Sequence, residues 1–274
     1  VEAREDQPVL TDAELDQYLK NNRYVIKVSP DQTTSFPDEK LPKLLDERMK
    51  GKVLFVYGEG FSHNLYANGY LENMFIQHFA DKGLKYVFGE QARSWVVKDD
   101  LYYKDPNAKL SNFYPDFKPD NIHMTEAFKA TYQKARFEFK AVDFERRSSF
   151  REALQVLAER VSPTNREELG RLMPYINDTS YMALSPAKFV DFLKQQRDNF
   201  YKDSSRIKQL SGDMFAGYSY LLTDPEPSQY KDNRNRNMAN HVLWQIGKPE
   251  PGALYMQTCG LYHARRKGDL LQKS

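Results

Sequence analysis

The stretch Val53-Leu-Phe-Val-Tyr-Gly-Glu-Gly-Phe-Ser-His63 decides how this chain is expected to fold. Its first five residues are apolar or aromatic, and glycines stand on either side of them. A short apolar run bounded in this way predicts a strand that is buried on both faces, as in the middle of a parallel sheet. Glu59 and His63 follow that strand directly. Because α/β proteins build their sites at the carboxyl ends of parallel strands, this carboxylate and imidazole are candidate functional groups.

A simpler interpretation of the same stretch is that its glycines form a tight turn and that His63 caps the next helix. The rest of the chain favours the functional interpretation, because three more apolar runs also end close to an acidic or imidazole side chain. These runs cover 84–90, 136–143 and 253–259, and the side chains are Glu90, Asp143 and His263.

The spacing of apolar residues predicts a helix over 64–82, between the first and second strands. A strand, a helix and a second strand within about forty residues form a parallel unit with a crossover connection. We therefore expect Glu59 and Glu90 at the ends of two neighbouring strands.

The composition limits the classes of partner. The 274 residues carry a net charge of +2, which gives no electrostatic argument for nucleic acid or a membrane surface as a partner. No apolar run approaches the roughly 20 residues that a transmembrane helix needs, and residues 1–20 lack the apolar core of a signal peptide. The single cysteine excludes an internal disulfide framework and a cysteine-rich zinc site. We expect a soluble protein; its first residue, Val1, leaves room for an upstream segment.

Two long segments complete the expected organisation. Residues 91–122 are rich in Asp, Lys, Pro and Tyr, which predicts a long loop that acts as a lid or a binding surface. Residues 162–222 have a helical pattern, with Ser-Pro helix starts at 162–163 and 185–186. The sequence thus predicts one α/β domain over 1–274, with a mostly parallel central sheet, helices on both faces, and a helical insertion at 162–225 that covers the site.

Five short motifs in this order resemble those of a known superfamily, which joins erythromycin esterases, Tiki and TraB proteins, and ChaN-like haem-binding lipoproteins. The resemblance spans about residues 50–265 and implies an EreA/ChaN-like fold. The motifs are Gly58-Glu59 with His63, Gly83-Leu-Lys-Tyr-Val-Phe-Gly-Glu90, Ala141-Val-Asp143, Arg236-Asn-Met-Ala-Asn240 and Gly260-Leu-Tyr-His263.

The sequence departs from typical erythromycin esterases at two points. The spacing from Glu59 to His63 is one residue longer, and Glu72 and Asn73 occupy the region where those esterases carry an arginine. The macrolide substrate of these relatives is therefore not carried over. Some bacterial toxins and type III effectors, including HopBA-type effectors of plant pathogens, resemble the same superfamily.

The chemistry expected of the predicted cluster is hydrolysis of an ester, amide or related bond in a small molecule or peptide. His63 or His263 would act as general base towards a water molecule, and Glu59 and Glu90 would orient the imidazoles. Direct attack by water is favoured over an acyl-enzyme because no Gly-x-Ser-x-Gly motif occurs.

Three further residues are expected to bind substrate. Asp143 lies at the third strand end, and Arg236, or Arg234 if the helix is phased differently, would stabilise a developing oxyanion. This mechanism requires no cofactor.

Three alternatives remain open at this point. The same ligand types suit a divalent metal such as Zn²⁺, Mn²⁺ or Fe²⁺, and the Tiki-like relatives imply a metal-dependent protease. The ChaN-like relatives imply haem binding. Finally, Glu59 and Glu90 could each pair with a buried arginine in a weakly catalytic or non-catalytic effector or toxin that binds a host protein. The chain would accordingly act in the bacterial cytoplasm or after secretion into a host cell.

Overall fold

The computed structural model describes residues 11–22, 27–29, 34–59, 66–114, 119–135, 137–223 and 234–260. His63 and His263 lie outside these residues, and Glu59 is described by its backbone only. The strands are β1 (Lys27–Val28), β2 (Thr34–Ser35), β3 (Leu54–Glu59), β4 (Leu84–Gly89), β5 (Glu138–Ala141) and β6 (Leu254–Gly260). The α-helices are α1 (Asp12–Asn22), α2 (Lys40–Met49), α3 (Tyr66–Ala80), α4 (Arg93–Lys104), α5 (Pro119–Ala135), α6 (Arg147–Glu159), α7 (Pro163–Leu172), α8 (Pro186–Ser211), α9 (Phe215–Thr223) and α10 (Arg234–Ile246). The 3₁₀ helices are η1 (Leu110–Asn112), η2 (Pro174–Ile176), η3 (Ser180–Ala183) and η4 (Gly212–Met214).

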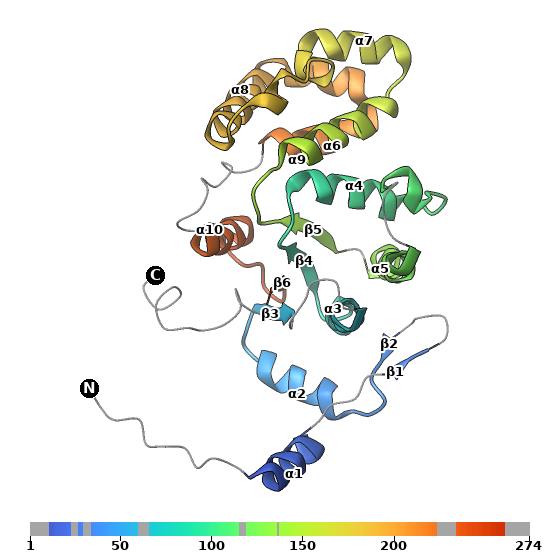
Figure 1. Cartoon of the computed structure of the whole chain (residues 1–274), viewed down its shortest axis with the longest axis vertical. Helices are drawn as coiled ribbons and strands as arrows, with labels where there is room; N and C mark the ends of the chain where they lie inside the picture. Colours follow the sequence, from blue (N-terminus) through green and yellow to red (C-terminus); the bar gives the residue numbers. More distant parts are fainter. Residues whose placement is uncertain are drawn as a thin grey trace, which may run out of the picture.

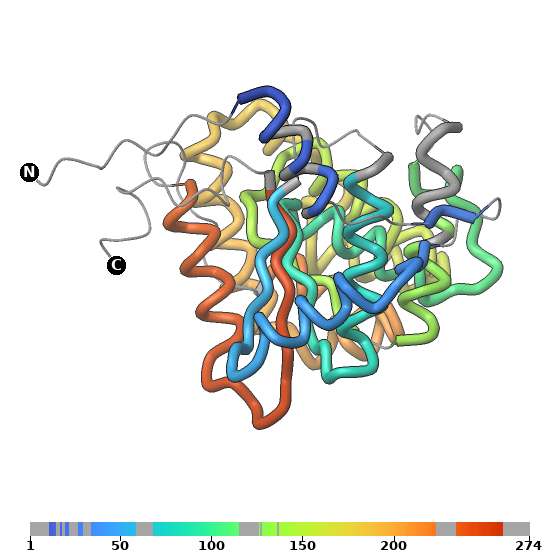
Figure 2. The backbone as a smooth tube through the Cα atoms, turned by 90° about the horizontal axis from the view of Figure 1, so that it is seen from below, coloured from blue at the N-terminus to red at the C-terminus, as the bar shows by residue number. Residues whose placement is uncertain are grey.

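The central sheet is parallel and has the strand order β3-β6-β4-β5. β6 pairs in parallel with β3 and β4, and β5 pairs in parallel with β4. Figure 2 shows β3 and β6 running side by side. The expected α/β class with a parallel sheet is confirmed.

The prediction that β3 and β4 are neighbours in the sheet is wrong, because β6 lies between them. β6 has a physical reason to be in the interior of the sheet: Tyr255, Met256 and Cys259 are each 2% exposed or less. A strand that is apolar on both faces is stabilised where it also has a neighbour on both edges.

Helices cover both faces of the sheet, as expected (Figure 1). On one face, Phe55 of β3 packs edge-to-face on Phe75 of α3, with ring centroids 5.2 Å apart. On the other face, Met238 and Val242 of α10 form a cluster with Phe88, Val142 and Tyr255. Neighbouring residues such as Val87 and Phe88 belong to opposite clusters, which is the two-residue alternation of a strand.

The helices α6 to α9 pack around a second core of their own. The predicted helix starts are confirmed: the Ser162 side chain accepts a hydrogen bond from the N–H of Asn165, and Ser185 caps α8 in the same way. Aromatic residues, including Phe189 and Phe200, are buried in this core. The predicted helical pattern of 162–222 corresponds to several helices, of which α8 is continuous to Ser211 and is followed by η4 and α9.

The predicted long loop at 91–122 is wrong, because most of it is helical: α4, η1 and the start of α5. The polar residues of α4 suggested a loop, but they have partners. Lys98 is 2% exposed and donates to Glu152 over 2.6 Å, and Asp99 accepts from the Tyr114 hydroxyl over 2.5 Å. Val96, Val97, Tyr102 and Tyr103 of α4 are buried, although Trp95 is 40% exposed, so most of the apolar surface of α4 is internal. None of the helices in the described ranges is long and apolar enough to cross a membrane.

Candidate functional site at the carboxyl ends of the strands

The carboxyl ends of the four strands lie at one edge of the sheet. Gly89 of β4 is level with Thr258 of β6 and with Ala141 of β5, so Glu90 leaves the sheet one residue beyond this line. Asp143 follows Ala141 by two residues, and the backbone of Glu59 is level with Gly260. The register thus brings the predicted acidic positions to the same edge.

Arg234 joins two of these acids. It is the first residue of α10, and its Nη2 donates to Glu90 Oε1 over 2.5 Å and to Asp143 Oδ2 over 2.7 Å. Its Nε donates to Asp143 Oδ1 over 3.0 Å. The contact with Asp143 is therefore bidentate, which is the strongest geometry for an arginine and a carboxylate.

Burial of the three side chains is unequal. Those of Glu90 and Asp143 are 10% and 5% exposed, whereas that of Arg234 is 35% exposed. The carboxylates thus hold the guanidinium from within the protein, and about a third of the Arg234 side chain is exposed.

Among the described residues, this cluster holds two acidic side chains and one guanidinium. The hydrogen bond to Asp143 is the largest cause that raises the pKa of Arg234, so the guanidinium is charged at every working pH. A carboxylate stabilises the protonated form of an imidazole placed beside it.

The structure distinguishes the two arginines that the sequence left open. Arg236 is exposed, and it follows Arg234 by two residues, or about 200° around the helix. Arg234 is therefore the arginine of α10 that faces the two carboxylates. The sequence does not show which of the two arginines faces the sheet, because the apolar residues of this helix begin only at Met238.

Glu145 is a buried acid that the sequence analysis missed. Its carboxylate accepts hydrogen bonds from the N–H of Ser94 over 2.9 Å, from the Ser94 hydroxyl over 2.6 Å and from the N–H of Arg146 over 3.0 Å. Burial raises the pKa of Glu145 despite these hydrogen bonds. It ties the segment after β5, which carries Asp143, to the start of α4. An acid two residues after Asp143 was its only signal in the sequence.

The other predicted site groups are not placed by the structure: His63, His263 and the side chain of Glu59 lie outside what it describes. Of the remaining histidines, His78 lies on α3 and contacts Asp46 over 2.9 Å, and burial lowers its pKa. Within the described part of the chain, no three His, Cys, Asp or Glu side chains are grouped so as to hold a metal ion.

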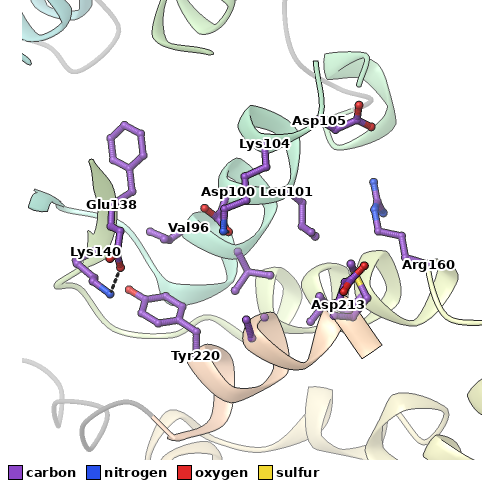
Figure 3. A pocket seen from close by; sticks show the side chains of 16 residues that line it. Val96, Asp100, Leu101, Lys104, Asp105, Glu138, Lys140, Arg160, Asp213 and Tyr220 are labelled. Atoms are coloured by element: carbon purple, nitrogen blue, oxygen red, sulfur yellow. Dashed lines mark hydrogen bonds and ion pairs between the residues drawn. The ribbon is translucent and has the colours of Figure 1, made fainter. Parts of the chain in front are cut away.

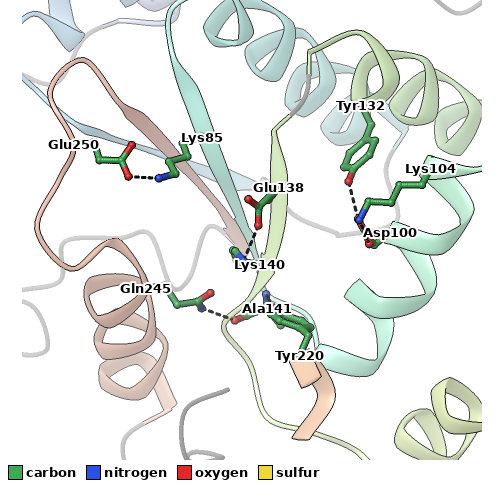
Figure 4. A network of polar contacts seen from close by, with 10 residues as sticks. All are labelled: Lys85, Asp100, Lys104, Tyr132, Glu138, Lys140, Ala141, Tyr220, Gln245 and Glu250. Atoms are coloured by element: carbon green, nitrogen blue, oxygen red, sulfur yellow. Dashed lines mark hydrogen bonds and ion pairs between the residues drawn. The ribbon is translucent and has the colours of Figure 1, made fainter. Parts of the chain in front are cut away.

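A larger cavity, of about 580 Å³, lies between α4, β5 and α9 (Figure 3). Its lining includes Glu138 and Lys140, which precede Ala141 on β5. The polar contacts in Figure 4 show how this part of β5 is held: the N–H of Ala141 donates to the Tyr220 hydroxyl over 2.7 Å, and Gln245 donates to the Ala141 carbonyl over 3.0 Å. This cavity therefore lies on the amino-terminal side of Ala141, away from Arg234.

A smaller cavity, of about 340 Å³, is lined by residues 144–148, which follow Asp143 in the chain, and by Met182 and the first turns of α8. Its Phe144 ring has the Arg234 Cζ atom 5.6 Å from its centroid. We associate this cavity, rather than the larger one, with the charged cluster.

Comparisons with known proteins give a likeness in backbone arrangement. No protein-family model matches the chain, and no curated protein sequence matches it. A solved structure of an erythromycin esterase mutant, EreC, in its open conformation has a TM-score of 0.49 and 14% identity, covering 87% of this chain and 67% of that one. A solved structure of a succinoglycan biosynthesis protein has a TM-score of 0.49 and 13% identity, covering 86% of this chain and 62% of that one. The class that the fold itself defines is an α/β protein with a parallel sheet between helices.

Proposed function

We propose that this chain is a hydrolase of an ester, amide or related bond, with its site around Arg234 at the carboxyl ends of β4 and β5. The observation that carries the proposal is the sharing of Arg234 between Glu90 and Asp143. These three residues come from three separate segments of the chain. A convergent, partly buried charge cluster at this edge of a parallel sheet is where α/β proteins bind and transform ligands.

Arg234 is assigned to the developing negative charge of the reaction. Its guanidinium is permanently charged, it is fixed in orientation by two carboxylates, and a third of its side chain is accessible. A preorganised cation of this kind stabilises an oxyanion that forms as a carbonyl is attacked. Glu90 and Asp143 are positioning residues in this scheme, and neither is needed as the base.

The general base is His63 or His263, oriented by Glu59. The imidazole takes a proton from water, the resulting hydroxide attacks the carbonyl carbon, and Arg234 balances the charge on the carbonyl oxygen. When the tetrahedral intermediate collapses, the imidazolium returns its proton to the leaving oxygen or nitrogen. The acidic side chains at these strand ends support this role, because carboxylates stabilise the imidazolium that forms between the two steps.

The helical segment 162–225 belongs to the same single domain in this proposal, and it covers the site. Support comes from α8, whose Pro186, Phe189 and Val190 line the smaller cavity together with residues that follow Asp143.

The experiment is a hydrolysis screen with chromogenic esters and anilides, run on the natural chain and on three variants. His63→Ala, His263→Ala and Arg234→Met are each expected to lower turnover by about a hundredfold or more while leaving the far-ultraviolet circular dichroism unchanged. Arg171→Met, an exposed change on α7, is the control. Activity that survives in all three variants would contradict the proposal.

Two further results separate the alternatives drawn from the sequence. Preincubation with a chelator is expected to leave turnover unchanged; a loss that Zn²⁺ or Mn²⁺ restores would assign water activation to a metal. An effector that only binds a host protein would show no turnover in any substrate class, and its biological effect would survive in His63→Ala.

A further inference from the structure

The smaller cavity is lined by apolar residues and by two arginines, which have no role in the proposed reaction. We propose that it is an anion-selective subsite for an amphipathic acyl group, one that joins an apolar portion to a carboxylate or another anion. The inference deepens the proposed function and rests on it, since it names the class of substrate that the Arg234 site would hydrolyse.

One part of the cavity lining is apolar. It is formed by Phe189, Val190 and Leu193 of α8, which are 3%, 5% and 3% exposed, and Phe189 and Leu193 also belong to the core of α6 to α9. Met182 and Pro186 extend the apolar lining. The volume of about 340 Å³ is within the range of small-molecule sites in proteins. The cavity is therefore suited to a medium-sized apolar group.

Two arginines in the lining of this cavity have no carboxylate partner among the described residues. Arg146 and Arg147 both line it. Across the ranges that the structure describes, neither guanidinium has a carboxylate partner: Arg146 lies over the Phe144 ring, and Arg147 donates to the backbone carbonyl of Leu184. The one acid in the lining, Glu145, is buried and already accepts three hydrogen bonds from Ser94 and Arg146. An anionic ligand would complete this charge arrangement.

The placement of these arginines is unfavourable for the helix itself. Arg146 is the N-cap residue and Arg147 the first residue of α6, whose first turn contains no acid. Positive side chains destabilise the amino-terminal end of a helix, because the helix dipole is positive there, whereas acidic side chains stabilise it. A pair of residues that breaks a local rule is typical of a functional position.

Phe144 connects this cavity to the proposed reaction centre. The Cζ atoms of Arg146 and Arg234 each lie 5.6 Å from the centroid of its ring. Arg234 does not line the cavity itself, so the proposal places the apolar portion of one ligand in the cavity, its anion against Arg146 and Arg147, and its carbonyl group past the Phe144 ring towards Arg234. This geometry defines the substrate as an ester or amide whose acyl group carries a second, anionic function.

The test uses 4-phenylbutyrate and its neutral isostere 4-phenylbutyramide as probes, with binding to the full chain measured by calorimetry. The carboxylate is expected to bind about tenfold more tightly than the amide. Arg146→Gln and Arg147→Gln should each remove most of this difference without affecting the amide. Val190→Trp fills the cavity and should abolish the binding of both probes. Arg171→Gln removes the same charge from an exposed position on α7 and is expected to change nothing.

Equal affinity for carboxylate and amide, or no effect of either arginine variant, would overturn the proposal, and so would binding that Arg171→Gln weakens equally. The arginine variants decide the matter even if Val190→Trp does not fold. Because binding is measured without turnover, the two proposals fail separately. Selective binding with no hydrolysis of esters that carry this acyl group refutes the hydrolase, whereas hydrolysis without selective binding refutes the subsite.

Discussion

Arg234 is the residue on which the candidate site depends, because it bridges two carboxylates that would otherwise repel each other. Glu90 and Asp143 are both largely buried and both bond to the same guanidinium. Carboxylates in this situation are stable only while the cation is present. The same residue thus has a structural role and the proposed role in catalysis, and a variant must be assayed for both.

We predict that Arg234→Met lowers the free energy of unfolding at pH 7 by about 2–3 kcal/mol, because two partly desolvated carboxylates lose their partner. Urea denaturation measures the change. Asp143→Asn together with Arg234→Met should recover part of the loss, since one of the two unpaired charges is then gone. A single variant as stable as the natural chain would show that the observed ion pairs contribute nothing.

Asp99 is expected to make the free energy of unfolding depend on pH. Burial raises the pKa of Asp99 to about 7, against the hydrogen bond from Tyr114, which lowers it. In the unfolded chain an aspartate titrates near 3.9. Between these two values the folded state binds more protons than the unfolded state, so Asp99 makes the free energy of unfolding fall as pH rises from about 4 to about 7.

Asp99→Asn keeps an oxygen for Tyr114 and removes the titration. In the variant, the free energy of unfolding should therefore no longer show the part of its fall with pH that Asp99 causes, which is at most about 1.4 kcal/mol per pH unit in this window. Urea denaturation at a series of pH values measures it, with the exposed Asp203→Asn on α8 as the control. An unchanged slope would mean that Asp99 is ionised throughout the window.

Among the elements, the turn between α3 and β4 lies very close to the turn before β6. Gly83 has a φ of +92°, and a Cβ added to it would lie 2.5 Å from the carbonyl oxygen of Gly252. Gly51 also has a positive φ, of +69°, but a Cβ there would meet nothing within 4 Å. An alanine substitution at Gly51 would thus introduce backbone strain alone, whereas one at Gly83 would introduce both backbone strain and a steric clash.

We predict that Gly51→Ala lowers the free energy of unfolding by about 1 kcal/mol, the cost of a left-handed conformation. Gly83→Ala should cost about 3 kcal/mol or more, because the new methyl group also displaces the turn before β6. Thermal and urea unfolding of both variants test this difference. Equal losses would show that β6 is not fixed against this turn.

The helices and strands themselves were largely predictable. The sequence pattern predicts a helix over 64–82, and α3 spans Tyr66–Ala80. At the start of α1, the Thr11 side chain accepts from the N–H of Glu14 while the Glu14 carboxylate accepts from the N–H of Thr11, which is a capping box. The predicted loop at α4 is wrong because the polar composition of this segment, and not the spacing of its apolar residues, suggested a loop. Its lysines and aspartates are paired or buried with their neighbours, and no count of polar residues reveals such partners.

At the scale of the whole molecule, α4 links two cores. Val97 packs in the core of α6 to α9, whereas Tyr102 and Tyr103 pack in the core under α3 and α5. Figure 1 shows α4 between these two groups of helices. The charged cluster lies where the sheet, α10 and the segment after β5 meet, so its geometry depends on the assembly of all three.

The arrangement of the whole molecule was the least predictable feature. Apolar patterns define each strand but not its neighbours, so the insertion of β6 between β3 and β4 had no signal in the sequence. The acids at the strand ends were predictable as positions, since Glu90 and Asp143 follow apolar runs. Their shared partner was not, because the pairing with Arg234 depends on the phase of α10 and on its packing across the sheet. Whether His63 and His263 join them stays a prediction.

The most direct test of the proposed site is an NMR titration of the histidine ring protons in the natural chain, in Arg234→Met and in Asp143→Asn. If His63 or His263 lies beside the cluster, removal of the guanidinium should raise its pKa by about one unit and removal of the carboxylate should lower it, because the sign of the neighbouring charge decides the direction. His78, which lies on α3 and pairs with Asp46, is the internal control and should not move. If neither His63 nor His263 responds to either variant, the imidazoles lie away from Arg234 and the proposed hydrolytic site does not exist.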